Sequence, residues 1–306
     1  MTSQPALQLT GLHKTFGRVT AVRGIDLTVE SGEVVALLGP NGAGKSTAID
    51  CALGLTRPTS GSAHLFGADP LTAIRSGRVG AMLQGGALLP ALTVARCVEL
   101  VAATHRRPLS VAEALDRAGC TDIARNRVAT LSGGQAQRVR FAVAVVSNPD
   151  LLFLDEPTAA MDVEARQGFW QNMREFTAQG RTVVFATHYL DEADSYADRV
   201  VMLSQGRIVA DGTPGEVKSI IRGRRIRLSF DGEWTPKVEA ALIGLPGVRT
   251  LSYRAGTLEM ASDDSDATLR ALLATRTDIH NIEVASRSMD EAFLALTTTE
   301  PQEERS

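Results

Sequence analysis

A phosphate-binding loop between a buried strand and a helix constrains the fold of this chain more than any other feature. Residues 39–47 read Gly-Pro-Asn-Gly-Ala-Gly-Lys-Ser-Thr, and residues 34–38 before them are all apolar. A continuous apolar run of this length predicts a strand that is buried on both faces, as in a parallel sheet. The residues from Lys45 to Leu53 predict a helix that Gly54 ends. A glycine-rich loop in this setting is typical of phosphate binding.

The loop supplies the contacts that a nucleoside triphosphate needs. Its glycines allow backbone N–H groups to turn toward phosphate oxygens, and the helix N-terminus adds a favourable dipole. Lys45 is predicted to reach the β- and γ-phosphates, Ser46 to offer a hydroxyl to Mg²⁺, and Thr47 to bond a phosphate. ATP and Mg²⁺ are therefore the expected ligands. The expected nucleotide contacts in the loop are Gly39, Asn41, Gly42, Gly44, Lys45, Ser46 and Thr47.

Two carboxylates follow a second wholly apolar strand. Residues 151–154 are Leu-Leu-Phe-Leu, and Asp155 and Glu156 come directly after them. In open α/β sheets, ligands bind at the rim that the carboxyl ends of the strands form. Asp155 is predicted to hold Mg²⁺ through water, and Glu156 to polarise the attacking water as general base. A solvated carboxylate pair in a loop is the alternative, which the apolar strand disfavours.

A second glycine-rich loop, Leu-Ser-Gly-Gly-Gln at 131–135, lies between these two motifs in the chain. Ser132 predicts the N-cap of a helix that runs through Val146. Together with the amides of Gly133 and Gly134, Ser132 would form a second anion-binding helix start. A second such loop is redundant within one nucleotide site, because the chain already has a phosphate loop.

The order of these motifs resembles the nucleotide-binding subunit of ATP-binding cassette (ABC) ATPases, and the resemblance covers residues 5–297. In that family, ATP lies between the phosphate loop of one copy and the Leu-Ser-Gly-Gly-Gln loop of another. The resemblance therefore implies a head-to-tail homodimer, with the loop from Ser132 to Gln135 completing the site of the other copy. Asp162 fits the family's D-loop, which serves the dimer interface, although Ala160 and Met161 depart from the usual pattern.

Three further residues receive roles from this resemblance. His188, after an apolar strand, matches the switch histidine that contacts the γ-phosphate. Gln84 matches the Q-loop glutamine, which touches Mg²⁺ and reports the nucleotide state to a transmembrane partner, but the Gly-Gly pair at 85–86 departs from the family. Phe16 matches the aromatic residue that stacks on adenine. Taken alone, each of these side chains has an ordinary structural interpretation.

Composition limits the partners. A net charge of −3 gives no overall basic footprint, so no nucleic-acid partner is expected. Three cysteines without metal-ligand spacing favour reduced thiols in the cytosol. No window approaches the roughly 18 uninterrupted apolar residues that indicate a membrane span. If the protein works at a membrane, a separate permease must cross it, and this chain is expected on the cytoplasmic face.

Alternating strand and helix segments predict an α/β P-loop NTPase fold with a largely parallel sheet and helices on both faces. The resemblance implies an ABC nucleotide-binding domain over 5–220, with a mixed sheet core and a helical subdomain at about 85–147. Composition shifts near 219–225. The βαββαβ order that follows, with a terminal helix over 289–296, suggests a small ferredoxin-like α+β domain over 224–297. A polar tail at 297–306 completes the prediction.

Residues 288–297 resemble the C-terminal extension of the drug-export branch, the daunorubicin-resistance-type ATPases that energise separate ABC-2 type permeases. The leading hypothesis is an ATPase subunit of an exporter of drugs, lipids or other small molecules. An importer ATPase subunit is one alternative. A soluble ABC ATPase that acts on DNA or ribosomes is another, but residues 84–131 leave no room for the coiled coil of the DNA-repair members. The sequence does not specify the transported substrate.

Overall fold

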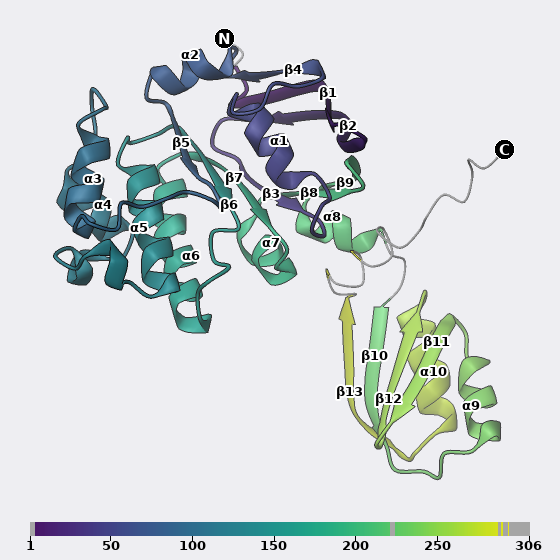
Figure 1. Ribbon diagram of the computed structural model, residues 1–306. Coiled ribbons are helices and arrows are strands. Elements are labelled where there is room, and N and C mark those ends of the chain that lie inside the picture. Colours follow the sequence, from purple (N-terminus) through teal and green to yellow (C-terminus); the bar gives the residue numbers. More distant parts are fainter. Residues whose placement is uncertain (1–3, 221–223, 287–288, 290–292, 294–306) are drawn as a thin grey trace. The chain divides into compact units, whose positions relative to one another are not determined.

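The computed structural model describes residues 4–220 and 224–286, together with Met289 and Phe293, and Figure 1 shows its helices and strands in chain order. The chain divides into two units, residues 1–214 and 215–306. The domain limits expected from sequence, 5–220 and 224–297, stay a prediction. The helix predicted over 289–296, apart from Met289 and Phe293, and the tail predicted over 297–306 lie outside the described residues.

The first unit is built around a six-stranded sheet in the order β5-β6-β7-β3-β8-β9. Its strands are β5 (Val79–Met82), β6 (Leu151–Asp155), β7 (Thr182–Thr187), β3 (Val34–Leu38), β8 (Arg199–Ser204) and β9 (Arg207–Gly212). The first five are parallel and β9 is antiparallel to β8. Every residue of β3, β6 and β7 is buried, as their apolar sequences predict. The predicted mixed, largely parallel sheet is confirmed.

A second, antiparallel sheet in the order β2-β1-β4 packs over the helix that follows the phosphate loop. Its strands are β1 (Leu7–Phe16), β2 (Val19–Val29) and β4 (Ser60–Leu65), and the helix is α1 (Lys45–Ala52). Apolar and polar residues alternate only near the start of β1, at 7–9, and near the end of β2, at 25–29. Backbone pairing nevertheless extends along the hairpin as far as Phe16 and Val19. The strands are therefore longer than alternation predicts.

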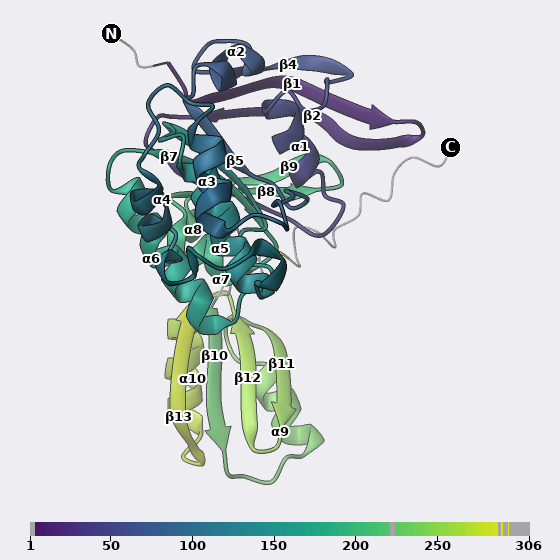
Figure 2. The same ribbon diagram turned by 60° about the vertical axis from the view of Figure 1, so that its left-hand side comes forward.

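Helices α3 (Val94–Ala102), α4 (Val111–Arg117) and α5 (Gly133–Val145) pack on one another beside β5, as Figures 1 and 2 show. They form the predicted helical subdomain, with two short 3₁₀ turns at Thr121–Ile123 and Val128–Thr130. The remaining helices of this part of the chain are α2 (Pro70–Arg75), α6 (Val163–Thr177), α7 (Leu190–Tyr196) and α8 (Pro214–Ser219), the last of which crosses the boundary between the units.

Aromatic contacts hold α5 and α6 against the sheet. Phe141 of α5 meets Phe169 of α6 edge-on at 5.0 Å between ring centroids, and Trp170 meets Phe185 of β7 at 4.7 Å. Tyr196 stacks on the other side of Trp170. Contacts of this kind add to the burial of the rings and favour one mutual orientation. They link the second half of α5 to α6, and α6 to β7.

The second unit has an antiparallel sheet in the order β11-β12-β10-β13. Its elements are β10 (Arg224–Phe230), α9 (Pro236–Ile243), β11 (Val248–Arg254), β12 (Thr257–Ser262), α10 (Ser265–Thr275) and β13 (Ile279–Ser286). Alternate strand residues and both helices share one core, which includes Leu228, Met260 and Leu272. This order and chain direction are those of the predicted ferredoxin-like βαββαβ fold.

Candidate nucleotide site

The phosphate loop joins β3 to α1 and requires glycine at two positions. Gly44, the N-cap of α1, has a φ of 103°, and a Cβ there would lie 2.4 Å from the carbonyl oxygen of Ala21. A Cβ on Gly39 would lie equally close, at 2.4 Å, to the carbonyl oxygen of Leu203. A side chain at either position would force the backbone apart, so both glycines are needed for the loop to close onto its neighbours.

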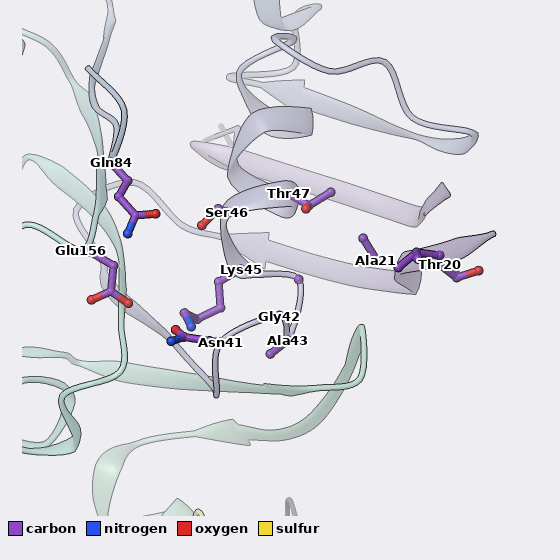
Figure 3. A pocket seen from close by; sticks show the side chains of 12 residues that line it. Thr20, Ala21, Asn41, Gly42, Ala43, Lys45, Ser46, Thr47, Gln84 and Glu156 are labelled. Atoms are coloured by element: carbon purple, nitrogen blue, oxygen red, sulfur yellow. The ribbon is translucent and has the colours of Figure 1, made fainter. Parts of the chain in front are cut away.

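The loop lines a pocket of about 490 Å³ together with residues 19–21, Gln84 and Glu156. Figure 3 shows Gln84 and Glu156 on one side of this pocket, Thr20 and Ala21 on the opposite side, and Lys45 and Asn41 between them. All the loop residues from Asn41 to Thr47 contribute to the lining. The structure thus brings the phosphate loop, Gln84 and Glu156 together as predicted, and their roles toward a nucleotide stay predictions.

Lys45 is buried and bonds to its own loop. Its Nζ donates to the carbonyl oxygens of Gly39 and Pro40, at 2.6 Å and 3.2 Å. Burial lowers the pKa of Lys45, and the nearby carboxylates of Glu156 and Asp155 oppose that shift. The ammonium group is held at the pocket wall by bonds that a phosphate can replace, which suits a cation that binds an anion.

Asp155, at the end of β6, is buried, and its Oδ1 has no hydrogen-bond partner within the described part of the chain. Burial raises the pKa of Asp155, while a hydrogen bond from Ser46 and the charge of Lys45 lower it. An unpaired buried carboxylate oxygen is costly unless a cation or a donor meets it. Ser46 and Asp155 therefore fit a Mg²⁺ ion. Mg²⁺ commonly binds one or two protein ligands together with substrate phosphates and water, so phosphate and water oxygens would complete its shell.

Glu156 stands in a strained and well-held conformation directly after β6. Its φ is 50°, a left-handed value that costs a non-glycine residue about 1–3 kcal/mol. Its backbone N–H donates to the Ala186 carbonyl oxygen at 2.9 Å, and its own carbonyl accepts from Gln137 at 3.1 Å. Its carboxylate Oε2 lies 2.7 Å from Nδ1 of His188. Strain of this kind persists where the surroundings hold it, and in this conformation the carboxylate meets His188.

His188 follows β7, and its side chain is 44% exposed, whereas that of Glu156 is 8% exposed. The ring of Tyr189 lies 4.2 Å from the His188 ring, between centroids. The guanidinium of Arg166, on α6, lies 4.1 Å from the Tyr189 ring centroid. The His188 imidazole thus lies beside a tyrosine that is itself in a cation–π pair with Arg166. Sequence reasoning identified His188 but not Tyr189 or Arg166, because the contact joins α6 to a residue distant in sequence.

Glu192 is buried and joins the two loops that flank Glu156. Its carboxylate accepts from Thr158 and, at 2.8 Å, from Thr187, and Arg166 lies 3.6 Å away. Thr158 follows Glu156 by two residues, and Thr187 immediately precedes His188. One buried carboxylate therefore ties the segment of Thr158 to the segment of His188 through two threonine hydroxyls, with the charge of Arg166 nearby.

The Leu-Ser-Gly-Gly-Gln loop lies outside the pocket of its own chain. Ser132 Oγ accepts from the Gln135 N–H at 3.2 Å, and the Gln135 side chain accepts from the Ser132 N–H at 3.0 Å, which forms a capping box. A Cβ on Gly133 would lie 3.3 Å from the Ala160 Cβ, so the loop is adjacent to the D-loop. The predicted N-cap at Ser132 is confirmed, and its contact with a nucleotide stays a prediction.

Five other predicted residues are also absent from the pocket lining: Gly39, Asp155, His188, Asp162 and Phe16. Asp162 caps α6, where its Oδ1 accepts from the Ala165 N–H at 2.8 Å. Phe16 is 50% exposed at the hairpin tip, with the Lys14 ammonium 4.6 Å from its ring centroid. Phe16 pairs with Val19, and Val19 does line the pocket. Residues 19–21 were not predicted from the sequence to line the pocket. The one sequence feature that could have indicated this is their position just after Phe16, at the start of the next strand.

The fold and the pocket together define a P-loop nucleotide-binding cassette with a small α+β unit attached. Within the described part of the chain, no helix is long and apolar enough to cross a membrane. The ABC transporter family model matches residues 22–159. In the solved structures, the chain resembles a dimeric ATP-binding cassette in a post-hydrolysis state bound to ADP and Pi, with a TM-score of 0.63 and 29% identity, over 68% of this chain and 98% of that one.

Relatives extend the similarity over both units. The daunorubicin/doxorubicin resistance ATP-binding protein of Streptomyces peucetius is 36% identical over 322 residues, which cover 100% of this chain and 97% of that protein. The Nod factor export ATP-binding protein I of Rhizobium leguminosarum bv. viciae is 32% identical over 305 residues, or 97% of this chain and 96% of that protein. The chain belongs to the ABC transporter family of ATP-hydrolysing subunits, in the drug-export branch.

Proposed function

We propose that this chain energises a membrane exporter of drugs, lipids or other small molecules, working from the cytoplasmic face through a separate permease. The observation that carries the proposal is the extent of the similarity to ATP-binding proteins named for drug resistance and Nod factor export. It covers 97% and 96% of those two proteins and therefore includes the second unit as well as the cassette.

In this proposal, Lys45 leaves the carbonyl oxygens of Gly39 and Pro40 and binds the β- and γ-phosphates of ATP. The loop amides and Thr47 bind the remaining phosphate oxygens at the N-terminus of α1. Phe16 stacks on adenine at the end of the pocket that residues 19–21 line. The left-handed glycines of the loop support this role because they let the backbone approach the phosphates closely.

Ser46, Asp155 and Gln84 would hold Mg²⁺, which when bound neutralises charge on the phosphates. Glu156 accepts a proton from the attacking water at its carboxylate, and His188 holds that carboxylate in place through Nδ1 while contacting the γ-phosphate. The 2.7 Å separation of Glu156 Oε2 from His188 Nδ1 supports a paired role. Burial of Glu156 keeps bulk water from competing for the carboxylate.

A second copy of the chain completes the site. The capped start of α5 presents Ser132 and Gly133 to solvent and not to the chain's own pocket, so its amide groups are available to the ATP of another copy. Asp162 lies at the same interface. The dimeric state of the similar ATP-binding cassette structure supports this arrangement. Hydrolysis would loosen the pair because the γ-phosphate is part of the contact.

The permease would dock on an apolar groove of about 310 Å³ between the sheet and the helical subdomain. The groove is lined by side chains that include Leu55, Leu83 and Val101, and Leu55 is 59% exposed. An apolar surface of this kind suits a protein partner. Gln84 follows Leu83 directly, so an occupant of the groove would act on the Q-loop.

Affinity purification from native membranes tests the exporter proposal. A tagged chain should recover an integral membrane permease, and Leu55→Asp should reduce that recovery without changing ATP hydrolysis by the isolated chain. Recovery of a solute-binding protein with the permease would indicate import instead. Recovery of the chain without a membrane protein, under conditions in which it binds ATP, would contradict the proposal.

A further inference from the structure

A buried polar side chain on α5 reaches the backbone of Glu156. Gln137, on α5, is only 7% exposed. Its Nε2 donates to the Glu156 carbonyl oxygen at 3.1 Å. A buried amide keeps its place only when both of its ends have partners. The other end, Oε1, accepts from Arg140 Nη1 at 2.8 Å, one turn further along α5.

Arg140 extends this chain of hydrogen bonds to the segment that follows Gln84. Its Nε donates to the Gly86 carbonyl oxygen at 2.8 Å. The Gly86 N–H donates to the Leu83 carbonyl at 3.0 Å, so residues 83–86 form a tight turn that presents the Gly86 carbonyl to Arg140. Arg140 thus donates one hydrogen bond to Gly86 and another to Gln137.

Each bond in this chain supports the next. The guanidinium of Arg140 is a cation, and charge-assisted bonds are the stronger kind. It fixes the Gln137 amide with Oε1 toward α5 and Nε2 toward Glu156, which is the only orientation that satisfies both neighbours. Partly buried polar networks of this sort resist rearrangement more than their separate bonds would. The Glu156 backbone is therefore held by α5 on one side and by Ala186 of β7 on the other.

Holding the Glu156 backbone matters because its φ of 50° is unfavourable for glutamate. Without the bond from Gln137, the residue can relax toward a more extended conformation. Its carboxylate would then move away from His188, to which it is joined at 2.7 Å. A misplacement of about 1 Å can cost an enzyme about 100-fold in rate.

We propose that Gln137 and Arg140 are positioning residues for ATP hydrolysis. They tie the turn over residues 83–86 to the backbone of Glu156, so that the position of this turn sets the alignment of the Glu156 carboxylate. The proposal rests on the proposed role of Glu156 as general base. It concerns the basal activity of the chain itself and does not depend on the exporter assignment.

Steady-state ATP hydrolysis by Gln137→Leu and Arg140→Ala tests the proposal. Each should lower kcat by about tenfold or more while the KM for ATP stays within about threefold, because the bonds act on the carboxylate and not on the phosphates. Arg140→Lys should recover part of the loss, since a lysine can still donate to the Gly86 carbonyl. Arg138→Ala is the matched control: Arg138 donates to the Gly119 carbonyl from the same helix, away from Glu156.

A double-mutant cycle with Glu156→Gln separates positioning from general destabilisation. If Gln137 acts through the Glu156 carboxylate, Gln137→Leu should slow single-turnover hydrolysis about tenfold in the native background and less than about twofold in the Glu156→Gln background. Gln137→Glu, which keeps an acceptor for Arg140 but loses the donor to Glu156, should behave like Gln137→Leu.

Equal losses in both backgrounds, or a loss as large in Arg138→Ala, would overturn the proposal. A Glu156→Gln protein with native turnover would instead refute the role of Glu156 on which the proposal rests. A drop in kcat for Gln137→Leu that is matched by loss of ATP binding would also overturn it. Melting temperatures of all variants show whether folding accounts for any difference.

Discussion

The two units differ in the charge that they bury, although both bury hydroxyls. The first buries charged side chains close to its pocket, among them Lys45, Asp155, Glu156 and Glu192. In the second, the buried polar side chains within the described residues are hydroxyls, those of Ser262, Ser265 and Thr268. A buried charge is costly to fold around, whereas a buried hydroxyl with a partner is nearly neutral. The comparison shows that the first unit carries the free-energy cost of buried charge next to its pocket, whereas the described part of the second unit does not.

The hydroxyls of the second unit bond to one another and to nearby backbone. Ser262 Oγ lies 2.6 Å from Thr268 Oγ1, and the Asp264 N–H donates to Ser262 Oγ at 3.1 Å. Thr268 Oγ1 also reaches the Pro246 carbonyl oxygen at 2.5 Å. These bonds join the end of β12 to the first turns of α10 and to the turn before β11. Their role is structural, because they hold these three segments of the second unit together.

Each unit also contains a spectroscopic reporter. The chain has two tryptophans, Trp170 in α6 and Trp234 before α9. Trp234 stacks on Tyr253 at 4.3 Å between ring centroids, within the core of the second unit. The three cysteines, Cys51, Cys97 and Cys120, are all buried in the first unit. Fluorescence of single-tryptophan variants and thiol labelling can therefore follow the two units separately.

The largest expected effect comes from Lys45→Ala. Removing this buried cation from the pocket wall, where it is proposed to bind the phosphates, should lower kcat/KM for ATP hydrolysis by about 100-fold or more. Trp234 fluorescence and its unfolding transition should not change. Steady-state phosphate release and a denaturant titration measure the two quantities. Full activity in Lys45→Ala would contradict a role for the phosphate loop in ATP hydrolysis.

Glu192→Ala should have the next largest effect, and within the first unit alone. The substitution leaves Thr158 and Thr187 without their carboxylate acceptor, which should lower the free energy of unfolding by about 1–3 kcal/mol. It should also lower kcat by about tenfold, because both segments that flank Glu156 lose their tie. Glu192→Gln, which keeps one acceptor, should recover part of both losses. A loss of stability with native kcat would show that Glu192 is structural only.

Leu272→Ala applies the same comparison to the second unit. Leu272 is fully buried in the core of α10 and the sheet, and its truncation should cost about 2–5 kcal/mol of unfolding free energy. Trp234 fluorescence should report an earlier transition. Basal ATP hydrolysis at a temperature where the second unit stays folded should remain within about twofold of native, because the pocket lies in the first unit. A proportionate loss of turnover would break the distinction between the units.

A smaller effect is expected when pH is changed and the Mg²⁺ concentration that hydrolysis requires is measured. Burial raises the pKa of Asp155, so this carboxyl takes up a proton at a higher pH than an exposed aspartate does. A protonated carboxyl is a poor magnesium ligand. The Mg²⁺ concentration for half-maximal hydrolysis should therefore rise as pH falls toward the raised pKa of Asp155. Asp155→Asn should remove this pH dependence, and a pH-independent requirement in the native chain would exclude Asp155 from the metal site.

The smallest effect is a slow reaction of the thiols. Burial raises the pKa of Cys120 to about 12, so little thiolate exists near pH 8. Alkylation of Cys120 should therefore proceed only as the first unit opens. It should quicken in Glu192→Ala and stay unchanged in Leu272→Ala. Mass spectrometry of timed samples measures the rate, and rapid labelling of the native chain would contradict the burial.

Elements with strong apolar patterns could be predicted from the sequence. The apolar runs of β3, β6 and β7 stand where they were expected, and α9 (Pro236–Ile243) is the first helix of the expected βαββαβ order. β4 was not predicted, because its sequence, Ser-Gly-Ser-Ala-His-Leu, is polar and it lies at a sheet edge, where pairing alone defines the strand. The long outer part of the β1–β2 hairpin escaped prediction for the same reason.

In the candidate site, local motifs could be predicted and long-range contacts could not. The phosphate loop and the carboxylates of β6 are readable because neighbouring residues make the pattern. The bond from Gln137 to the Glu156 backbone joins residues 19 apart in sequence, and Glu192 reaches Thr158 across 34. A glutamine on a helix or a glutamate after a histidine looks like a surface residue until the fold places its partner.

Hydrolysis by Glu156→Gln tests the central claim most directly. The variant should bind ATP as the native chain does, and in the presence of Mg²⁺ its single-turnover hydrolysis should be slower by about 100-fold or more. Light scattering should then find a dimer that persists with ATP and dissociates when ATP is removed. Native-like turnover in Glu156→Gln, with ATP bound, would contradict the account.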